Sequence, residues 1–129
     1  MTEAGRINAT DALADLTAAF DAYEDALIHN KVSVLDALFW SYRLTLRFGA
    51  KENLSGADQI KAFRASRPTV GLQRKITDRP IVTFGSTTGV ANITFKRTAK
   101  SRIGRQTQTW IKVAEGWRVV AAHVSWMDH

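Results

Sequence analysis

Three side chains combine useful chemistry with positions from which they could reach one site: Tyr23, Arg47 and His123. An imidazole has an unperturbed pKa of about 6.5, so His123 is the best candidate for proton transfer near neutral pH. The guanidinium of Arg47 stays protonated and can hold a carboxylate through two parallel N–H donors. A phenol such as Tyr23 can donate a hydrogen bond to an oxygen on which negative charge develops. Together these residues would suit a reaction on a small carboxylate-bearing molecule.

Each of these residues also has a simpler structural interpretation. Tyr23 lies on an apolar helical stripe, where it can be a core aromatic residue whose hydroxyl bonds to the backbone. Arg47 alternates with apolar neighbours in a predicted strand, which is typical of an arginine that faces solvent. If Arg47 instead points inward, it requires an anion, either a bound carboxylate or an internal one such as Glu52. His123 can be a hydrogen-bonded residue of the core.

Five further residues are candidates for substrate binding. Arg64 lies near the end of a predicted helix, where a solvated cation that favours the helix dipole is the simpler interpretation. Strand periodicity places His123 on the same face as the apolar residues Trp117 and Val119. Ser125 follows on that face, which we expect to line the interior. The five candidates are Trp40, Asn53, Arg64, Gln108 and Ser125.

The composition excludes several classes of protein. With 129 residues, 45% of them hydrophobic and 23% charged, the chain has the size and composition of one globular domain spanning residues 1–129. No apolar run approaches the roughly 18 residues of a membrane-spanning helix, and residues 1–10 lack the pattern of a secretory signal. We therefore expect a cytoplasmic protein without a membrane partner, and a flexible N-terminus over residues 1–9.

Metal, thiol and nucleic-acid chemistry find little support in the sequence. It contains no cysteine, and His29, His123 and His129 lack the spacing of a zinc site, so we expect neither a metal nor another cofactor. The net charge of +6 comes from basic residues scattered between Arg6 and Arg118, without a basic block that contains interleaved aromatics. This distribution argues against nucleic-acid binding, while the excess positive charge would steer small anions toward the protein.

The periodicity of the apolar residues indicates the α+β class. Steps of three and four along Thr10–Ile28 make the stripe of an amphipathic helix, and a short helix follows at Val32–Phe39. A third helix begins near Gly56 and ends before Pro68. Alternating patterns predict a curved antiparallel sheet onto which the three helices pack. The predicted strands are Tyr42–Phe48, Leu72–Thr77, Pro80–Phe84, Thr88–Lys96, Gly104–Val113 and Trp117–Trp126.

The order of these elements and the ending Gly116–Ser125 resemble the NTF2-like (nuclear transport factor 2) superfamily, whose members fold as a cone that encloses a cavity. Within that superfamily the chain resembles the AtzH-like family of small bacterial proteins associated with amidases in urea, allophanate and cyanuric acid degradation. The resemblance covers about residues 15–126. Its matching segments are Phe20–Leu27, Val34–Trp40, Arg47–Gly49, Glu52–Leu54, Ile60–Arg64, Gly104–Trp110 and the ending.

The resemblance also implies positions for two of the candidate residues. Ketosteroid isomerases of the same superfamily carry an oxyanion-donating Tyr on the first helix and a catalytic Asp at the end of the first strand. Tyr23 occupies the Tyr position, and Arg47, nine residues before Gly56, occupies the Asp position. A guanidinium cannot abstract a proton, so we expect steroid isomerisation to be lost. We expect the cavity itself to be retained.

The resemblance implies a small hydrolase of the decarboxylating amidohydrolase type, acting on a carboxylated urea such as carboxybiuret or dicarboxyurea on the route to allophanate. Arg47 would bind the substrate carboxylate, Tyr23 would donate to the carbonyl oxygen, and His123 or a water held by it would deliver the nucleophile. The alternatives are a non-catalytic module that binds a ligand or associates with an amidase, and another NTF2-like isomerase or dehydratase. A homodimer paired through the sheet is a further implication.

Overall fold

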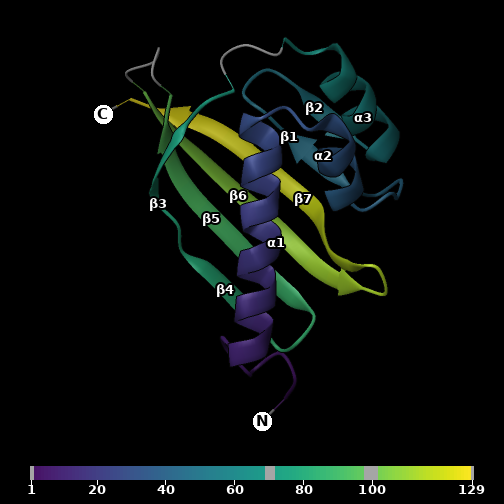
Figure 1. Ribbon diagram of the computed structural model, residues 1–129, viewed down its shortest axis with the longest axis vertical. Coiled ribbons are helices and arrows are strands. Elements are labelled where there is room, and N and C mark those ends of the chain that lie inside the picture. Colours follow the sequence, from purple (N-terminus) through teal and green to yellow (C-terminus); the bar gives the residue numbers. More distant parts are fainter. Residues whose placement is uncertain (1, 69–71, 98–101, 129) are drawn as a thin grey trace.

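The helix α1 (Thr10–Ile28) forms where apolar residues recur at steps of three and four, and it buries that stripe against a sheet. The computed structural model describes residues 2–68, 72–97 and 102–128. Two shorter helices, α2 (Val32–Leu38) and α3 (Ala57–Ser66), complete the helical layer. Within the described residues, no helix is both long and apolar enough to cross a bilayer. The strands are β1 (Leu46–Phe48), β2 (Asn53–Ser55), β3 (Lys75–Asp78), β4 (Ile81–Phe84), β5 (Thr88–Lys96), β6 (Ile103–Val113) and β7 (Gly116–Met127), shown in Figure 1.

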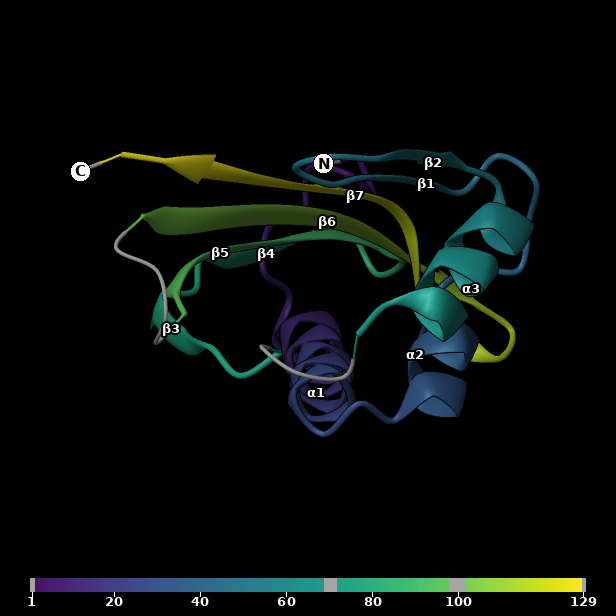
Figure 2. The same ribbon diagram turned by 90° about the horizontal axis from the view of Figure 1, so that it is seen from above.

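Seven strands form one curved sheet in the order β2-β1-β7-β6-β5-β3, and β4 also pairs with β5. The three helices lie on one face of this sheet, as Figure 2 shows. The arrangement confirms the predicted α+β class with helices packed on a curved sheet. One pairing differs from the expected antiparallel pattern, because β1 runs parallel to β7. The sheet is therefore mixed, and the three-residue strand β1 lies beside the longest strand, β7.

The core lies between α1 and the inner face of β5, β6 and β7. Leu16, Phe20 and Tyr23 of α1 are buried, and α2 and α3 add Leu35 and Ile60. Burying side chains of this size contributes about 1.5–3 kcal/mol each, so the cluster supplies much of the driving force for folding. The strands contribute the buried residues Ala91, Ile93, Phe95, Trp110, Trp117, Val119 and Ala122.

A β-bulge in β7 decides which of its residues face the core. Val119 and Ala121 pair with two successive residues of β6, so Val120 between them has no partner in that strand. Side chains alternate between the two faces of a strand with a period of two. The extra residue therefore reverses the face of every residue that follows it in β7.

The bulge overturns the expectation that His123 and Ser125 line the interior. Beyond it, Ala122, Val124 and Trp126 pack against the core. His123 and Ser125 consequently lie on the outer face of the sheet, and His123 is exposed. Simple alternation from the start of the strand fails here because it assumes an unbroken register.

The first strand is shorter than the predicted strand Tyr42–Phe48. Residues Tyr42–Thr45 form a turn, in which the Tyr42 carbonyl accepts hydrogen bonds from the backbone N–H groups of Thr45 and Ala57. The strand begins only at Leu46. The sequence prediction also missed β2, which follows a tight turn closed by the Gly49 N–H and the Glu52 carbonyl at 2.9 Å. Three-residue strands are too short to show a period, so tertiary pairing determines them.

The N-terminal segment, expected to be flexible over residues 1–9, is bonded to β4. The backbone N–H of Asn8 donates to the Thr83 carbonyl at 3.0 Å, and its side-chain oxygen accepts from the Thr83 N–H at 2.9 Å. The N–H of Gly85 donates to the Arg6 carbonyl at 2.9 Å. These bonds satisfy the edge of β4, which otherwise exposes unpaired backbone groups.

We expect deletion of Val120 to destabilise the protein far less than deletion of Ala122. Val119 and Ala121 already pair with successive residues of β6, so removal of Val120 leaves the register and the faces of the later residues unchanged. Removal of the paired residue Ala122 forces the end of β7 out of register or onto the wrong face, at several times the roughly 1 kcal/mol of a typical point substitution. Urea denaturation followed by circular dichroism measures both variants, and a Val120 deletion as destabilising as the Ala122 deletion would contradict the assignment of the bulge.

Candidate functional site

A cavity of about 270 Å³ opens among the end of α3, the turn between β1 and β2, and the ends of β5 and β7. Apolar side chains such as Phe63, Leu72 and Trp126 form part of its wall. Among the described residues its charged lining comprises four cations and a single carboxylate. Such an imbalance in a partly enclosed site attracts small anions. The charged residues are Arg47, Lys51, Arg67, Arg97 and Glu52.

Arg47 points into this cavity from the middle of β1. It pairs in register with the core residue Ala122 of β7, and its guanidinium lies over the Phe63 ring at 5.4 Å from the ring centroid. Its Nη1 donates to Glu52 Oε1 at 2.8 Å, and both side chains are largely buried. An inward Arg47 was expected to require an anion, and the structure supplies Glu52 as that anion.

Arg67 is the lining cation whose charge is least compensated. No carboxylate lies within ion-pair distance of it in the described part of the chain, and its Nε and Nη2 atoms are buried without a hydrogen-bond acceptor. Burial lowers the pKa of the Arg67 guanidinium. The phenol of Tyr23 raises that pKa, whereas the neighbouring guanidinium groups lower it. Each of these observations favours an anion bound beside Arg67.

Arg97 extends the same cationic wall from the residue after β5. Burial lowers the pKa of the Arg97 guanidinium, and Arg74 and Arg47 lower it further. Its guanidinium lies 5.8 Å from the centroid of the Trp126 ring. The cavity thus brings together guanidinium groups from β1, α3 and β5.

Arg64 does not occupy the solvated helix end that the sequence suggested, and that expectation is wrong. The residue is only 4% exposed, and its Nη1 donates to Asp36 Oδ1 of α2 at 2.6 Å. Its guanidinium also covers the ring of Phe39 at 4.8 Å. The pair lines a separate hollow of about 140 Å³, so Arg64 joins α2 to α3 and does not reach the larger cavity.

Tyr23 lies in the buried core and is not among the residues that line the cavity. Its ring packs near those of Phe20, Phe39 and Trp110, with centroids 6.2 to 6.5 Å apart. Its phenol interacts electrostatically with Arg67, which lines the cavity. The structure thus shows Tyr23 as a core aromatic residue, and its role as a donor stays a prediction.

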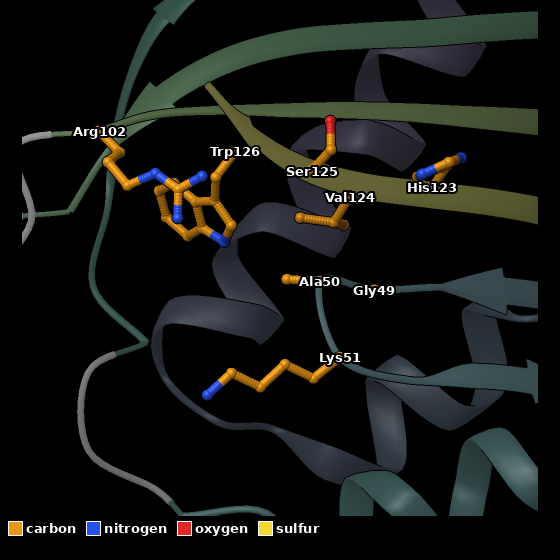
Figure 3. A pocket seen from close by; sticks show the side chains of 8 residues that line it. All are labelled: Gly49, Ala50, Lys51, Arg102, His123, Val124, Ser125 and Trp126. Carbon is orange, nitrogen blue, oxygen red and sulfur yellow. The ribbon is translucent and has the colours of Figure 1, made fainter. Parts of the chain in front are cut away.

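His123 and Ser125 line a different hollow, of about 420 Å³, between the end of β7 and the turn after β1. Figure 3 shows this hollow, which shares part of its lining with the cavity. The shared residues are Gly49, Ala50, Lys51, Val124 and Trp126. The imidazole of His123 packs edge-on against the exposed ring of Phe48, with centroids 6.0 Å apart. The structure therefore separates His123 from Arg47 and Tyr23, which face the inner side.

The remaining candidates also lie outside the cavity. Trp40 stacks on Tyr42 with ring centroids 4.8 Å apart, and Asn53 is exposed at the start of β2. Gln108 is fully buried, and its Oε1 accepts a hydrogen bond from Trp110 Nε1 at 3.1 Å. Gln108 and Trp110 share the inner face of β6. Alternation along the strand predicts that they share a face but not which face this is.

Sequence reasoning did not select Arg67 or Arg97 for the site. A signal for Arg67 is present, because it lies four residues after Phe63, which was predicted to point inward from the same helix. Arg97 follows the long strand β5, and its spacing from the predicted inward residues gives no indication that it belongs to the site. Glu52 was considered only as a competing partner for Arg47.

Comparison with known proteins relates the whole chain to one family. The family model described as AtzH-like matches residues 5–129. A protein with unknown function from the DUF3225 family of Pectobacterium atrosepticum is 53% identical, with a TM-score of 0.93 and 95% of each chain covered. A cystatin-like fold protein from Burkholderia xenovorans is 36% identical, with a TM-score of 0.93, covering 96% of this chain and 98% of that chain. A search of the curated proteins finds no match.

A more distantly related structure has the same fold. An NTF2-like superfamily protein from Salmonella enterica serovar Typhimurium is 19% identical, with a TM-score of 0.73, and the alignment covers 93% of this chain and 94% of that chain. At this identity the likeness concerns the fold alone. It confirms the NTF2-like cone that the sequence predicted.

We expect Arg67→Met to stabilise the protein while abolishing its response to small anions. The lowered pKa of Arg67 means that its charge is less favourable in the folded state than in the unfolded state, so removing the charge should raise the free energy of unfolding by about 0.5–2 kcal/mol. Added malonate should raise the melting temperature of the wild type but not of the variant. The control is Arg105→Met on the outer face, and a destabilised Arg67→Met would contradict the assignment.

Proposed function

The chain belongs to the AtzH-like family, and from this membership and its cationic cavity we propose a small hydrolase of the decarboxylating amidohydrolase type. Its substrate would be a carboxylated urea derivative, such as carboxybiuret or dicarboxyurea on the route to allophanate. The NTF2-like superfamily to which its fold belongs includes enzymes. The substrate class follows from the charge of the site and from the family.

The observation that carries this proposal is the balance of charge in the cavity. Four cations and one carboxylate line a space of about 270 Å³, which suits a small polar anion better than a steroid-sized apolar molecule. One of the cations, Arg67, has buried nitrogens that lack an acceptor. A substrate carboxylate would supply acceptor oxygens to a guanidinium that the fold leaves uncompensated.

The roles proposed for the residues follow from their places around the cavity. Arg67, with Arg47 beside it, would hold the substrate carboxylate. Tyr23 would donate to the carbonyl oxygen as negative charge develops there. His123 faces outward and has no part in this scheme. Guanidinium groups stabilise a carboxylate and oppose its loss, so cleavage of an amide by water is chemically easier here than direct decarboxylation.

A non-catalytic binding module is the second candidate function. The charged side chains at the cavity are mainly cations, which bind anions but neither attack a carbonyl nor accept a proton. A protein of this kind would hold a labile carboxylated intermediate or deliver it to an associated amidase.

A second copy of the chain is proposed as the partner of the outer sheet face. That face carries a shallow groove of about 200 Å³ that includes Leu46, Phe48 and Ala121, and Phe48 is 37% exposed. Exposed aromatic and aliphatic residues on an uncovered sheet face favour association. The family resemblance implies the same homodimer.

Purified protein should release ammonia from carboxybiuret faster than the spontaneous reaction does. Loss of the phenol in Tyr23→Phe should lower kcat about 100-fold, as expected for one donor to a developing oxyanion. Arg67→Met should mainly raise KM, while Arg105→Met on the outer face should change neither constant. Ammonia and carbon dioxide are followed together. Binding of carboxybiuret without any rate above the spontaneous one would instead support the binding module.

Replacement of Phe48 by Arg should convert a dimer into a monomer in analytical ultracentrifugation, because a charge would be buried at the centre of the proposed contact. Val34→Arg serves as the control, since Val34 is 39% exposed on α2, in the helical layer. Circular dichroism checks that both variants fold. A wild-type protein that sediments as a monomer would exclude this partner.

A further inference from the structure

Among the lining residues that the structure describes, one side chain of the cavity can accept a proton. Among the described residues that line it, Glu52 is the only acid, and none is a histidine, cysteine, serine, threonine or tyrosine. The remaining charged residues are cations, which cannot act as bases while protonated. Glu52 is therefore the first candidate base for any reaction in this cavity that removes a proton from water or substrate.

The position of Glu52 is fixed by two sets of contacts. The tight turn between β1 and β2 holds its backbone, because the Gly49 N–H donates to its carbonyl at 2.9 Å. Arg47 Nη1 holds its side chain at Oε1 at 2.8 Å. A carboxylate offers about four lone-pair sites on its two oxygens, so the bond to Arg47 leaves acceptor capacity for a water molecule.

The neighbouring glycine leaves room for this carboxylate. A Cβ atom built on Gly49 would overlap Glu52 Oε1 and crowd Arg47 Nη1 at 3.2 Å. Gly49 does not have a positive φ, so alanine could adopt its backbone conformation. The Glu52 carboxylate therefore occupies the space that a side chain at residue 49 would need.

We infer that Glu52 is the general base of the proposed hydrolysis, an inference that rests on that function. Glu52 takes a proton from a water molecule while the water oxygen bonds to the carbonyl carbon of the bound urea. The carbonyl electron pair moves to oxygen, to which Tyr23 is the proposed donor. When the pair returns, the bond from this carbon to the terminal nitrogen of carboxybiuret breaks, the proton passes from Glu52 to that nitrogen, and ammonia leaves. The Glu52 carboxylate is regenerated, and the other product is dicarboxyurea, whose N-carboxyl groups can then leave as carbon dioxide.

Four cations line the cavity together with Glu52. Arg47 and Lys51 belong to its own hairpin, Arg67 comes from the end of α3, and Arg97 follows β5. Cations can hold the substrate anion but cannot take a proton, so the role of base falls to Glu52.

The test compares Glu52→Gln and Gly49→Ala with the wild type on carboxybiuret. Glu52→Gln should lower kcat at least about 100-fold with little change in KM. Glu52→Asp should recover part of the rate. Gly49→Ala keeps the carboxylate but displaces it, and a misplacement of about 1 Å should also lower kcat about 100-fold.

The outcomes separate this inference from the proposed function. An active wild type whose Glu52→Gln variant keeps its kcat would overturn the role of Glu52 and leave the proposed hydrolase activity unaffected. A wild type with no rate above the spontaneous one would overturn both. If Glu52→Gln does not fold, Gly49→Ala still decides, because an unchanged kcat in that folded variant would contradict a positioned base.

Discussion

The constraint on which this structure depends is that a guanidinium group keeps its charge when it is buried. Each arginine placed beneath the sheet therefore requires acceptors from elsewhere in the chain. Three of these arginines receive a carboxylate, and in doing so they join α2 to α3, α1 to the segment before β3, and β1 to its own turn. Arg67 receives none among the described residues, and the proposal of a bound anion rests on this difference. The three pairs are Arg64–Asp36, Arg74–Glu24 and Arg47–Glu52.

Aromatic rings also stabilise the buried guanidinium groups. Four guanidinium groups lie over the face of a ring, at 4.4 to 5.8 Å from its centroid, and such contacts are worth about 0.5–2 kcal/mol each. The rings also exclude water, which strengthens every charge interaction near them. An interior of this kind is well suited to bind an anion and poorly suited to an apolar ligand. The ring partners are Phe63 for Arg47, Phe39 for Arg64, Phe95 for Arg74 and Trp126 for Arg97.

Periodicity and resemblance predicted the fold well and the site only in part. The bounds of α1 and β5 agree with the sequence prediction, because both elements are long enough for their period to be unambiguous. Resemblance, but not alternation, placed Arg47 inside. The outward position of His123 could not be predicted, since one unpaired residue in β7 reverses the face of those after it. Whether an inward arginine meets substrate or an internal acid is likewise decided by tertiary neighbours.

The parallel pairing of β1 with β7 has a consequence for the synthesis of the protein. Arg47 lies in the first strand, yet the register that holds it in place is set by the last strand, which leaves the ribosome after all the others. Pairings between distant segments form slowly, because the intervening chain must lose its freedom first. The nascent chain thus carries Arg47 without the wall of the cavity that β7 supplies. That wall, formed in part by Val124 and Trp126, is added only when β7 itself has been synthesised.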